Sequence, residues 1–260
     1  MYAKPRSRFW SDFLTAIMVQ IFILGLCVTF YPIVRGFVVD RVIENNANDF
    51  LIRLEETMPS EPSFDELPFI PEETEPPEET RPHEDLWNDM VTYNERIYQQ
   101  HQTGLSCEYD YQRASFILKD YGLEDEIFGV ISIPAMELEM PIYLGATEQH
   151  MADGAAHMTQ TSIPIGGINT NAVIAGHRGY SGASYFRYIE KLKPGDLVTV
   201  RNLWETLNYR VSSIKIIDPH DVEKILIQDG RELLTLLSCH PYASGGKQRY
   251  VVYCERIPNP

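Results

Sequence analysis

The chain of 260 residues has few cysteines and few basic residues. Its four cysteines, at positions 27, 107, 239 and 254, include no C-x-x-C pair, so we predict neither a disulfide scaffold nor a cysteine-ligated metal site. There are 22 Lys and Arg residues against 37 Asp and Glu, and no basic stripe is visible. Because proteins neutralise nucleic-acid phosphates with such stripes, we expect no nucleic acid among the partners.

The negative charge is concentrated in one segment. Residues 55–85 hold 12 acidic residues and one basic residue, so the rest of the chain has a net charge of only −4. Seven of the 17 prolines lie in the same stretch. A proline-rich chain of like charge cannot bury a core, so residues 57–85 are predicted to form an extended linker that acts as a spacer. A binding role for its EETEPPEET segment is the alternative.

Residues 13–34 contain no charged side chain and are long enough to cross a membrane as a helix. A cleaved signal peptide would have a shorter apolar region followed by an A-x-A-like site, and TFYPIVRG follows here instead. Lys4, Arg6 and Arg8 precede the span, so the positive-inside rule places residues 1–12 in the cytoplasm. We therefore expect a single-pass anchor in the cell membrane, with the rest of the chain outside the cell.

The remaining sequence divides into two helical parts and one β-rich part. Residues 35–56 are predicted to be a membrane-proximal helical segment, and residues 86–100 have the apolar spacing of an amphipathic helix that begins the folded part at 86–126. From 127 to 257 about seven short β-type runs alternate with turn residues, with one helical insert at 184–192. This texture predicts a mostly-β domain that forms a closed or nearly closed barrel.

Cys239 is the best candidate for a nucleophile. It ends the apolar strand LLTLLSC just before His-Pro-Tyr, and a thiol at a strand end is open to substrate. A thiolate is a strong nucleophile when a neighbouring cation lowers its pKa. The alternative is an inert core residue, because buried cysteines are common at the ends of apolar strands.

His177 and Arg249 are the residues that favour the catalytic interpretation. His177 closes the apolar strand VIAGH, and Arg249 begins the strand QRYVVYCE ten residues after Cys239. That gap suits a hairpin, which would place Arg249 beside Cys239. A thiol, an imidazole and a guanidinium together supply the nucleophile, the acid/base and the oxyanion donor that acyl transfer from a peptide needs.

Three motifs resemble those of a known family. VIAGHRG (173–179), TLLSCHPY (235–242) and QRYVV (248–252), in this order and with LKPGD (192–196) between the first two, are similar to the motifs of sortases, and specifically of the class C, pilin-polymerising branch. FGVISIPAMELEMPIYLG (128–145) resembles the first two barrel strands of that branch, and FYPIVRGFV (30–38) with TYNE (92–95) resembles its membrane-proximal segment.

The resemblance implies an eight-stranded sortase barrel and a cysteine transpeptidase without a cofactor. Cys239 would attack the Thr–Gly bond of an LPXTG-like sorting signal, with His177 as the general acid/base and Arg249 as the oxyanion or substrate clamp. Thr235 and Ser238 would shape the substrate groove. The thioester would then pass to an amine, either a pilin lysine or a cell-wall peptide amine.

The resemblance also implies a lid over the active site, for which Asp110 and Tyr111 are the nearest match to an Asp-Pro-aromatic pattern. An ordinary connecting turn at these residues is the alternative. A disulfide between Cys107 and Cys254 is a further alternative, because the space outside the cell permits disulfides. No metal site is predicted at His150 and His157, because no further ligand follows at a recognisable spacing.

Two other functions remain as alternatives. A membrane-tethered β-domain that binds a wall component, with a structural Cys239, would have the same anchor and linker. A wall-anchoring sortase of another class would share the chemistry and differ in its accepting amine.

Overall fold

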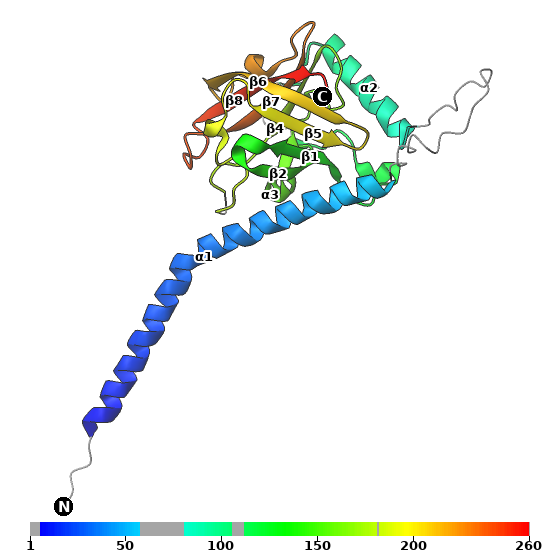
Figure 1. Ribbon diagram of the computed structural model, residues 1–260. Helices are drawn as coiled ribbons and strands as arrows, with labels where there is room; N and C mark the ends of the chain where they lie inside the picture. The colour runs from blue at the N-terminus through cyan, green and yellow to red at the C-terminus, as the bar shows by residue number, and fades with distance from the viewer. Residues whose placement is uncertain (1–5, 58–80, 106–111, 181, 260) are drawn as a thin grey trace, which may run out of the picture.

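Residues 127–257 form a closed β-barrel. The structure, a computed structural model, describes residues 6–57, 81–105, 112–180 and 182–259. Within these residues eight strands close into a barrel in the order β1-β2-β3-β4-β7-β8-β6-β5 (Figure 1). The predicted eight-stranded barrel is thus confirmed. Most of the predicted linker, together with Cys107, Asp110 and Tyr111, lies outside the described residues.

The strands of the barrel are mostly antiparallel, but β2 pairs parallel with β3, and β4 pairs parallel with β7. Their bounds are β1 (Ile127–Ile133), β2 (Leu138–Leu144), β3 (Ala155–His157), β4 (Thr170–Ala175), β5 (Leu197–Asn202), β6 (Thr206–Ile217), β7 (Glu232–His240) and β8 (Gln248–Ile257). The short helix α3 (Glu148–Asp153) lies between β2 and β3. The parallel pair β4 and β7 matters for function, because it brings the ends of two strands to the same rim of the barrel.

Two details of the sequence-based prediction differ from the structure. The eighth strand, β3, was not among the predicted runs, because three residues are too few to show an alternating pattern. The helical insert predicted at 184–192 is confirmed only in part. Turns occupy 185–188, and a short 3₁₀ helix, η4, forms at Ile189–Lys191.

The amphipathic helix predicted at 86–100 is α2 (Glu84–Gln99). Its buried residues include Asn94, which interrupts the apolar spacing. The Asn94 amide donates to the carbonyl of Ile163 at 3.1 Å and its oxygen accepts from the Ile163 amide at 2.7 Å. Burial of Asn94 costs little free energy, because both polar groups of its side chain are hydrogen-bonded. The two bonds attach α2 to the segment that contains Ile163.

The N-terminal helix α1 (Arg6–Thr57) is one continuous helix of 52 residues. It contains both the predicted span and the predicted membrane-proximal segment, and it is long and apolar enough to cross a membrane. Pro32 lies inside it, and we attribute the bend of α1 in Figure 1 to this residue, because proline removes one backbone hydrogen bond.

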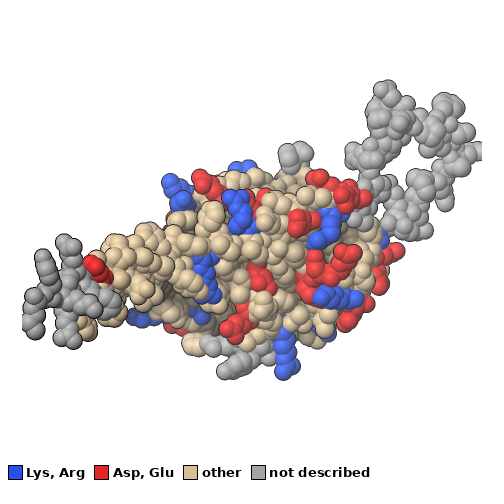
Figure 2. Space-filling model, turned by 90° about the horizontal axis from the view of Figure 1, so that it is seen from below, with Lys and Arg blue, Asp and Glu red and all other residues tan. Residues whose placement is uncertain are grey.

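The two halves of α1 have different surroundings. In its second half Ile43, Ala47, Phe50 and Leu54 are buried against the barrel, at the spacing of one helix face. Its first half has large apolar side chains that are exposed, such as Phe22. Figure 2 shows few charged side chains on this exposed end, whereas acidic and basic side chains are interspersed over the barrel face.

Candidate active site

The topology of the barrel brings the three predicted catalytic residues together. In the antiparallel pair β7 and β8, Cys239 lies directly opposite Arg249. The parallel pairing of β4 with β7 ends at Ala175 and Leu237, and the amide of Gly176 donates to the carbonyl of Leu237 at 3.1 Å. His177, two residues after the end of β4, therefore lies at the same rim of the barrel as Cys239, near the end of β7.

The Arg249 guanidinium is held beside the Cys239 thiol. Its Nη1 lies 4.0 Å from the Cys239 Sγ and donates to the carbonyl of Gly246 at 2.7 Å. A Cβ at Gly246 would come within 2.8 Å of Arg249 Nη1 and 3.3 Å of Cys239 Sγ, and the backbone there has φ of 81°. Glycine at this position thus admits both the turn and the approach of the guanidinium to the thiol.

His177 lies between aromatic rings. Tyr180 stacks on the imidazole with ring centroids 4.3 Å apart, and the Tyr185 ring meets its edge at 5.8 Å. Burial lowers the pKa of His177 below its ordinary value. The imidazole is therefore mainly neutral near pH 7, the form that can accept a proton from an entering amine.

The three side chains line one cavity of about 280 Å³. Its other lining residues are mainly apolar and include Leu105, Met151, Met158, Ile217, Ile225 and Leu237. A concave apolar site with a few convergent polar groups is the usual form of a ligand site. The cavity therefore offers a ligand an apolar surface beside a thiol, an imidazole and a guanidinium.

Thr235 and Ser238 do not offer their hydroxyl groups to a ligand. Thr235 is buried and donates to Asn171 Oδ1 at 2.8 Å, and it is not among the described residues that line the cavity. Ser238 lines the cavity, but its hydroxyl donates to the carbonyl of Gly176 at 2.7 Å. Both hydroxyls thus join β7 to the β4 side of the barrel, so their contribution is to hold Cys239 and His177 in place.

The sequence interpretation missed Arg178. Its side chain is only 3% exposed, and its Nη2 pairs with Glu190 at 2.7 Å. Its Nη1 lies 3.4 Å from the carbonyl oxygen of Cys239, and Glu190 also contacts His240 Nδ1 at 3.1 Å. One buried guanidinium thus links the backbone of Cys239 to the loop after β4. The only signal in the sequence was its position next to His177.

Glu190→Ala is expected to lower the stability of this rim, because it leaves the buried Arg178 guanidinium without its carboxylate. The cost should be about 1–3 kcal/mol of unfolding free energy, measured by denaturant unfolding. Glu223→Ala, at an exposed position in η5 (Val222–Ile225), is the matched control. Equal stability of the two variants would contradict a supporting role for Glu190.

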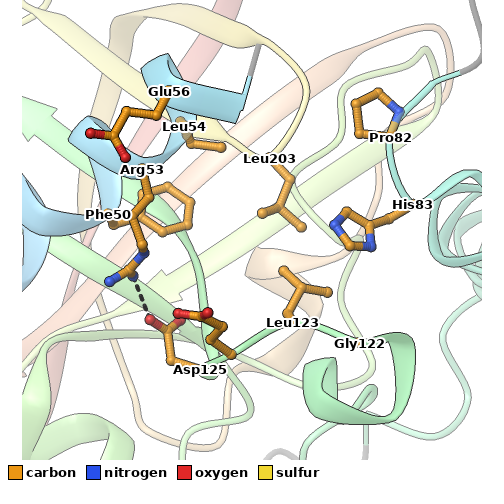
Figure 3. Close-up of a pocket in the computed structure, with 11 residues that line it drawn as sticks. Phe50, Arg53, Leu54, Glu56, Pro82, His83, Gly122, Leu123, Asp125 and Leu203 are labelled. Atoms are coloured by element: carbon orange, nitrogen blue, oxygen red, sulfur yellow. Dashed lines mark hydrogen bonds and ion pairs between the residues drawn. The ribbon is translucent and has the colours of Figure 1, made fainter.

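A second, larger cavity of about 360 Å³ lies elsewhere, where α1 ends and α2 begins. Figure 3 shows the apolar side chains of Phe50, Leu54 and Leu203 on its wall, and the ion pair between Arg53 and Asp125. None of the predicted site residues that the structure describes lines this cavity. Its size therefore does not make it the catalytic site.

Two histidines that the sequence analysis considered, His150 and His157, do not line the cavity. Asp110 and Tyr111, the candidate lid, lie outside the described residues. His150 stacks on Tyr143, and the Nδ1 of His150 lies 2.9 Å from the carbonyl oxygen of Gly145. His157 is fully buried, with its Nε2 near the carbonyls that follow β3 and a pKa lowered to about 4 by burial. Among the described residues no group of His, Cys, Asp and Glu could hold a metal ion.

A closed barrel with a thiol, an imidazole and a guanidinium at one rim defines a site for thiol-mediated acyl transfer. The sequence model of the sortase family, described as the sortase domain, matches residues 131–257 of this chain. The sortase C1 of GBS pilus island 1 is 30% identical, with a TM-score of 0.60 over 68% of this chain and 90% of that chain. Sortase C-1 from Streptococcus pneumoniae is 31% identical, with a TM-score of 0.54 over 66% and 92%. The chain belongs to the sortase family.

Curated relatives agree with this assignment over a shorter region. Sortase D of Bacillus subtilis (strain 168) is 28% identical over 131 residues, which is 50% of this chain and 63% of that protein. The chain spans between 52% and 63% of the length of the first curated relatives it matches. Three solved structures with which it shares its fold are class C sortases.

Proposed function

We propose that this protein is a membrane-anchored cysteine transpeptidase that cleaves an LPXTG-like sorting signal between Thr and Gly. The observation that carries the proposal is the direct pairing of Cys239 with Arg249 at the rim where His177 leaves β4, with all three in one apolar cavity. A binding domain with a structural cysteine has no need for a guanidinium 4.0 Å from the thiol.

The reaction proceeds in two acyl transfers. The thiol proton of Cys239 passes to the neutral His177 as the sulfur attacks the Thr carbonyl carbon, and Arg249 stabilises the negative charge on the carbonyl oxygen. The C–N bond to Gly breaks as His177 gives a proton to the leaving amine, which leaves a thioester on Cys239. An entering amine then attacks the thioester carbon and its proton passes to His177. The C–S bond breaks to release the new amide, and His177 returns the proton to the sulfur, which restores the thiol.

The acceptor that we favour is a pilin lysine, so that the product is a pilus polymer. This choice is supported by the likeness to class C sortases, one of which is described as belonging to a pilus island. The second candidate is a peptidoglycan peptide amine, which would anchor surface proteins to the wall. Support for this alternative is that the curated relatives include sortases D and A, whose names do not place them in class C.

We place the barrel outside the cell, with α1 as a single-pass anchor. The exposed apolar side chains of the first half of α1 support a membrane location. Lys4, Arg6 and Arg8 precede the uncharged run, and this excess of positive charge favours a cytoplasmic N-terminus.

The test is mass spectrometry of the full chain incubated with a library of LPXTG-type peptides. We expect a mass increase on the peptide that contains Cys239, equal to the sorting signal up to Thr, and its loss on addition of an amine. Lysine-containing pilin segments and peptidoglycan peptides are added separately to distinguish the two acceptors. A library that leaves Cys239 unmodified would contradict the proposal.

A further inference from the structure

The face of α1 that packs on the barrel begins at Gly36. From there Gly36, Asp40, Ile43, Ala47, Phe50 and Leu54 follow one another at alternating steps of four and three residues, as on one side of a helix. Gly36 is buried, whereas its neighbours Phe37 and Val38 are exposed. Gly36 is therefore the first residue of α1 in the face that contacts the folded domain.

The partner of Gly36 is the loop that follows His177. A Cβ at Gly36 would lie 2.4 Å from the carbonyl oxygen of Gly182, and a Cβ at Gly182 would lie 2.6 Å from the carbonyl oxygen of Pro32. The two backbones thus approach so closely that neither residue has space for a side chain. Such a contact fixes the loop against the helix.

One turn further along α1, Asp40 holds the same loop. Its carboxylate accepts hydrogen bonds from the Ser184 amide at 2.6 Å and from the Ser184 hydroxyl at 2.9 Å. Both acceptor oxygens of Asp40 are used. Charge-assisted bonds of this kind are about twice as strong as those between neutral groups.

The loop in turn surrounds His177. Tyr185 directly follows Ser184, its ring meets the imidazole edge, and its hydroxyl donates to the carbonyl of Ala152 at 2.7 Å. The Phe186 amide donates to the carbonyl of His177 at 3.0 Å. A shift of Ser184 would therefore move both the ring beside the imidazole and the backbone bond that holds His177.

We infer that Gly36 and Asp40 of α1 are positioning residues for His177, so that the membrane-anchoring helix is part of the support of the active site. The inference rests on the proposed function, in which His177 transfers the protons. Asp40 acts through Ser184, and Gly36 acts through Gly182. The orientation of the imidazole thus depends on how α1 lies against the barrel.

The experiment uses the full chain in detergent micelles and compares Gly36→Ala with Gly25→Ala. Alanine favours a helix more than glycine does, so neither change weakens α1 itself. A Cβ at Gly25 would meet nothing within 4 Å, whereas one at Gly36 would displace the loop. We expect kcat of Gly36→Ala to fall about 10–100-fold with KM essentially unchanged, as for a misplaced catalytic group. Gly25→Ala should match wild type.

Asp40 is tested by removal and by a conservative variant. Asp40→Ala loses both bonds to Ser184 and should lose kcat like Gly36→Ala. Asp40→Asn can accept from the Ser184 amide and donate to its hydroxyl, so it should recover most of the activity. Asp49→Ala, at an exposed position of α1, is the control for charge. Equal losses in Asp40→Asn and Asp40→Ala would overturn the role of these hydrogen bonds.

A second readout needs no peptide substrate. The pH profile of Cys239 modification by a small methanethiosulfonate is followed by mass spectrometry in wild type, Gly36→Ala and His177→Ala. A displaced imidazole should move the Gly36→Ala profile toward that of His177→Ala. If wild type cleaves no peptide and the profile still moves, the proposed function fails and the positioning role stands. If wild type cleaves and Gly36→Ala matches Gly25→Ala in both readouts, the positioning role is overturned.

Discussion

Replacing Cys239 with alanine is expected to abolish thioester formation and peptide cleavage while the barrel stays folded. Among the described residues that line the cavity, Cys239 supplies the only thiol. Its Sγ lies 4.0 Å from Arg249 Nη1. Cys239 is half-buried at the end of β7, so the loss of one sulfur atom should change the unfolding free energy by about 1 kcal/mol or less. The measurements are acyl-enzyme mass spectrometry and thermal unfolding.

Cys254→Ala is the matched control for this prediction. Cys254 is fully buried in the core, where burial raises the pKa of its thiol to about 12. This change should lower stability by about 1–3 kcal/mol and leave thioester formation intact. Thioester formation in Cys239→Ala, or its loss in Cys254→Ala at a temperature where that variant is folded, would mean that the nucleophile is wrongly assigned.

The pairing of Cys239 with Arg249 could be predicted from the sequence because it depends on local chain geometry. Ten residues separate the two positions, and a hairpin of that length brings the two strands side by side. The register then follows from the turn, which Gly246 makes compatible with the guanidinium. The barrel itself was predictable for a similar reason, since most of its strands are long enough to show their alternation.

The loop after His177 could not be predicted in the same way. Apolar residues at 186, 189 and 192 have helical spacing, yet 185–188 form turns and only Ile189–Lys191 is helical, as a 3₁₀ helix. The Phe186 ring packs against Gly176. The Ser184 amide donates a hydrogen bond to Asp40, 144 positions earlier in the chain. Such distant contacts outweigh local propensity. The ion pair of Arg178 with Glu190 depends on the conformation of the same loop, so no local sequence pattern predicts it.

The helix α1 is an intermediate case. The spacing of Ile43, Ala47, Phe50 and Leu54 is present in the sequence and predicts a helix with one buried face. The sequence does not say which surface of the barrel this face covers. That information comes from the contacts of Gly36 and Asp40 with the loop after β4, which depend on the complete fold.

Arg249→Lys is expected to reduce the rate of acylation by about 10²–10³, although the positive charge is kept. Arg249 donates to the carbonyl of Gly246 at 2.7 Å, and its guanidinium still has other donors in a fixed plane next to the thiol. A lysine has a single nitrogen on a flexible stem, so it cannot hold Gly246 and a developing oxyanion in the same geometry. The measurement is single-turnover acylation of Cys239 with an LPXTG-type peptide.

The control for this change is Arg210→Lys. Arg210 is exposed on β6, and it also donates to a glycine carbonyl, that of Gly195 at 3.1 Å. The same substitution there should leave acylation unchanged, because Arg210 is not among the residues that line the catalytic cavity. A rate for Arg249→Lys within a few-fold of wild type would mean that Arg249 contributes only its charge. Because the lysine keeps that charge, the size of the loss measures how much of the stabilisation of the oxyanion depends on the planar arrangement of donors beside Cys239.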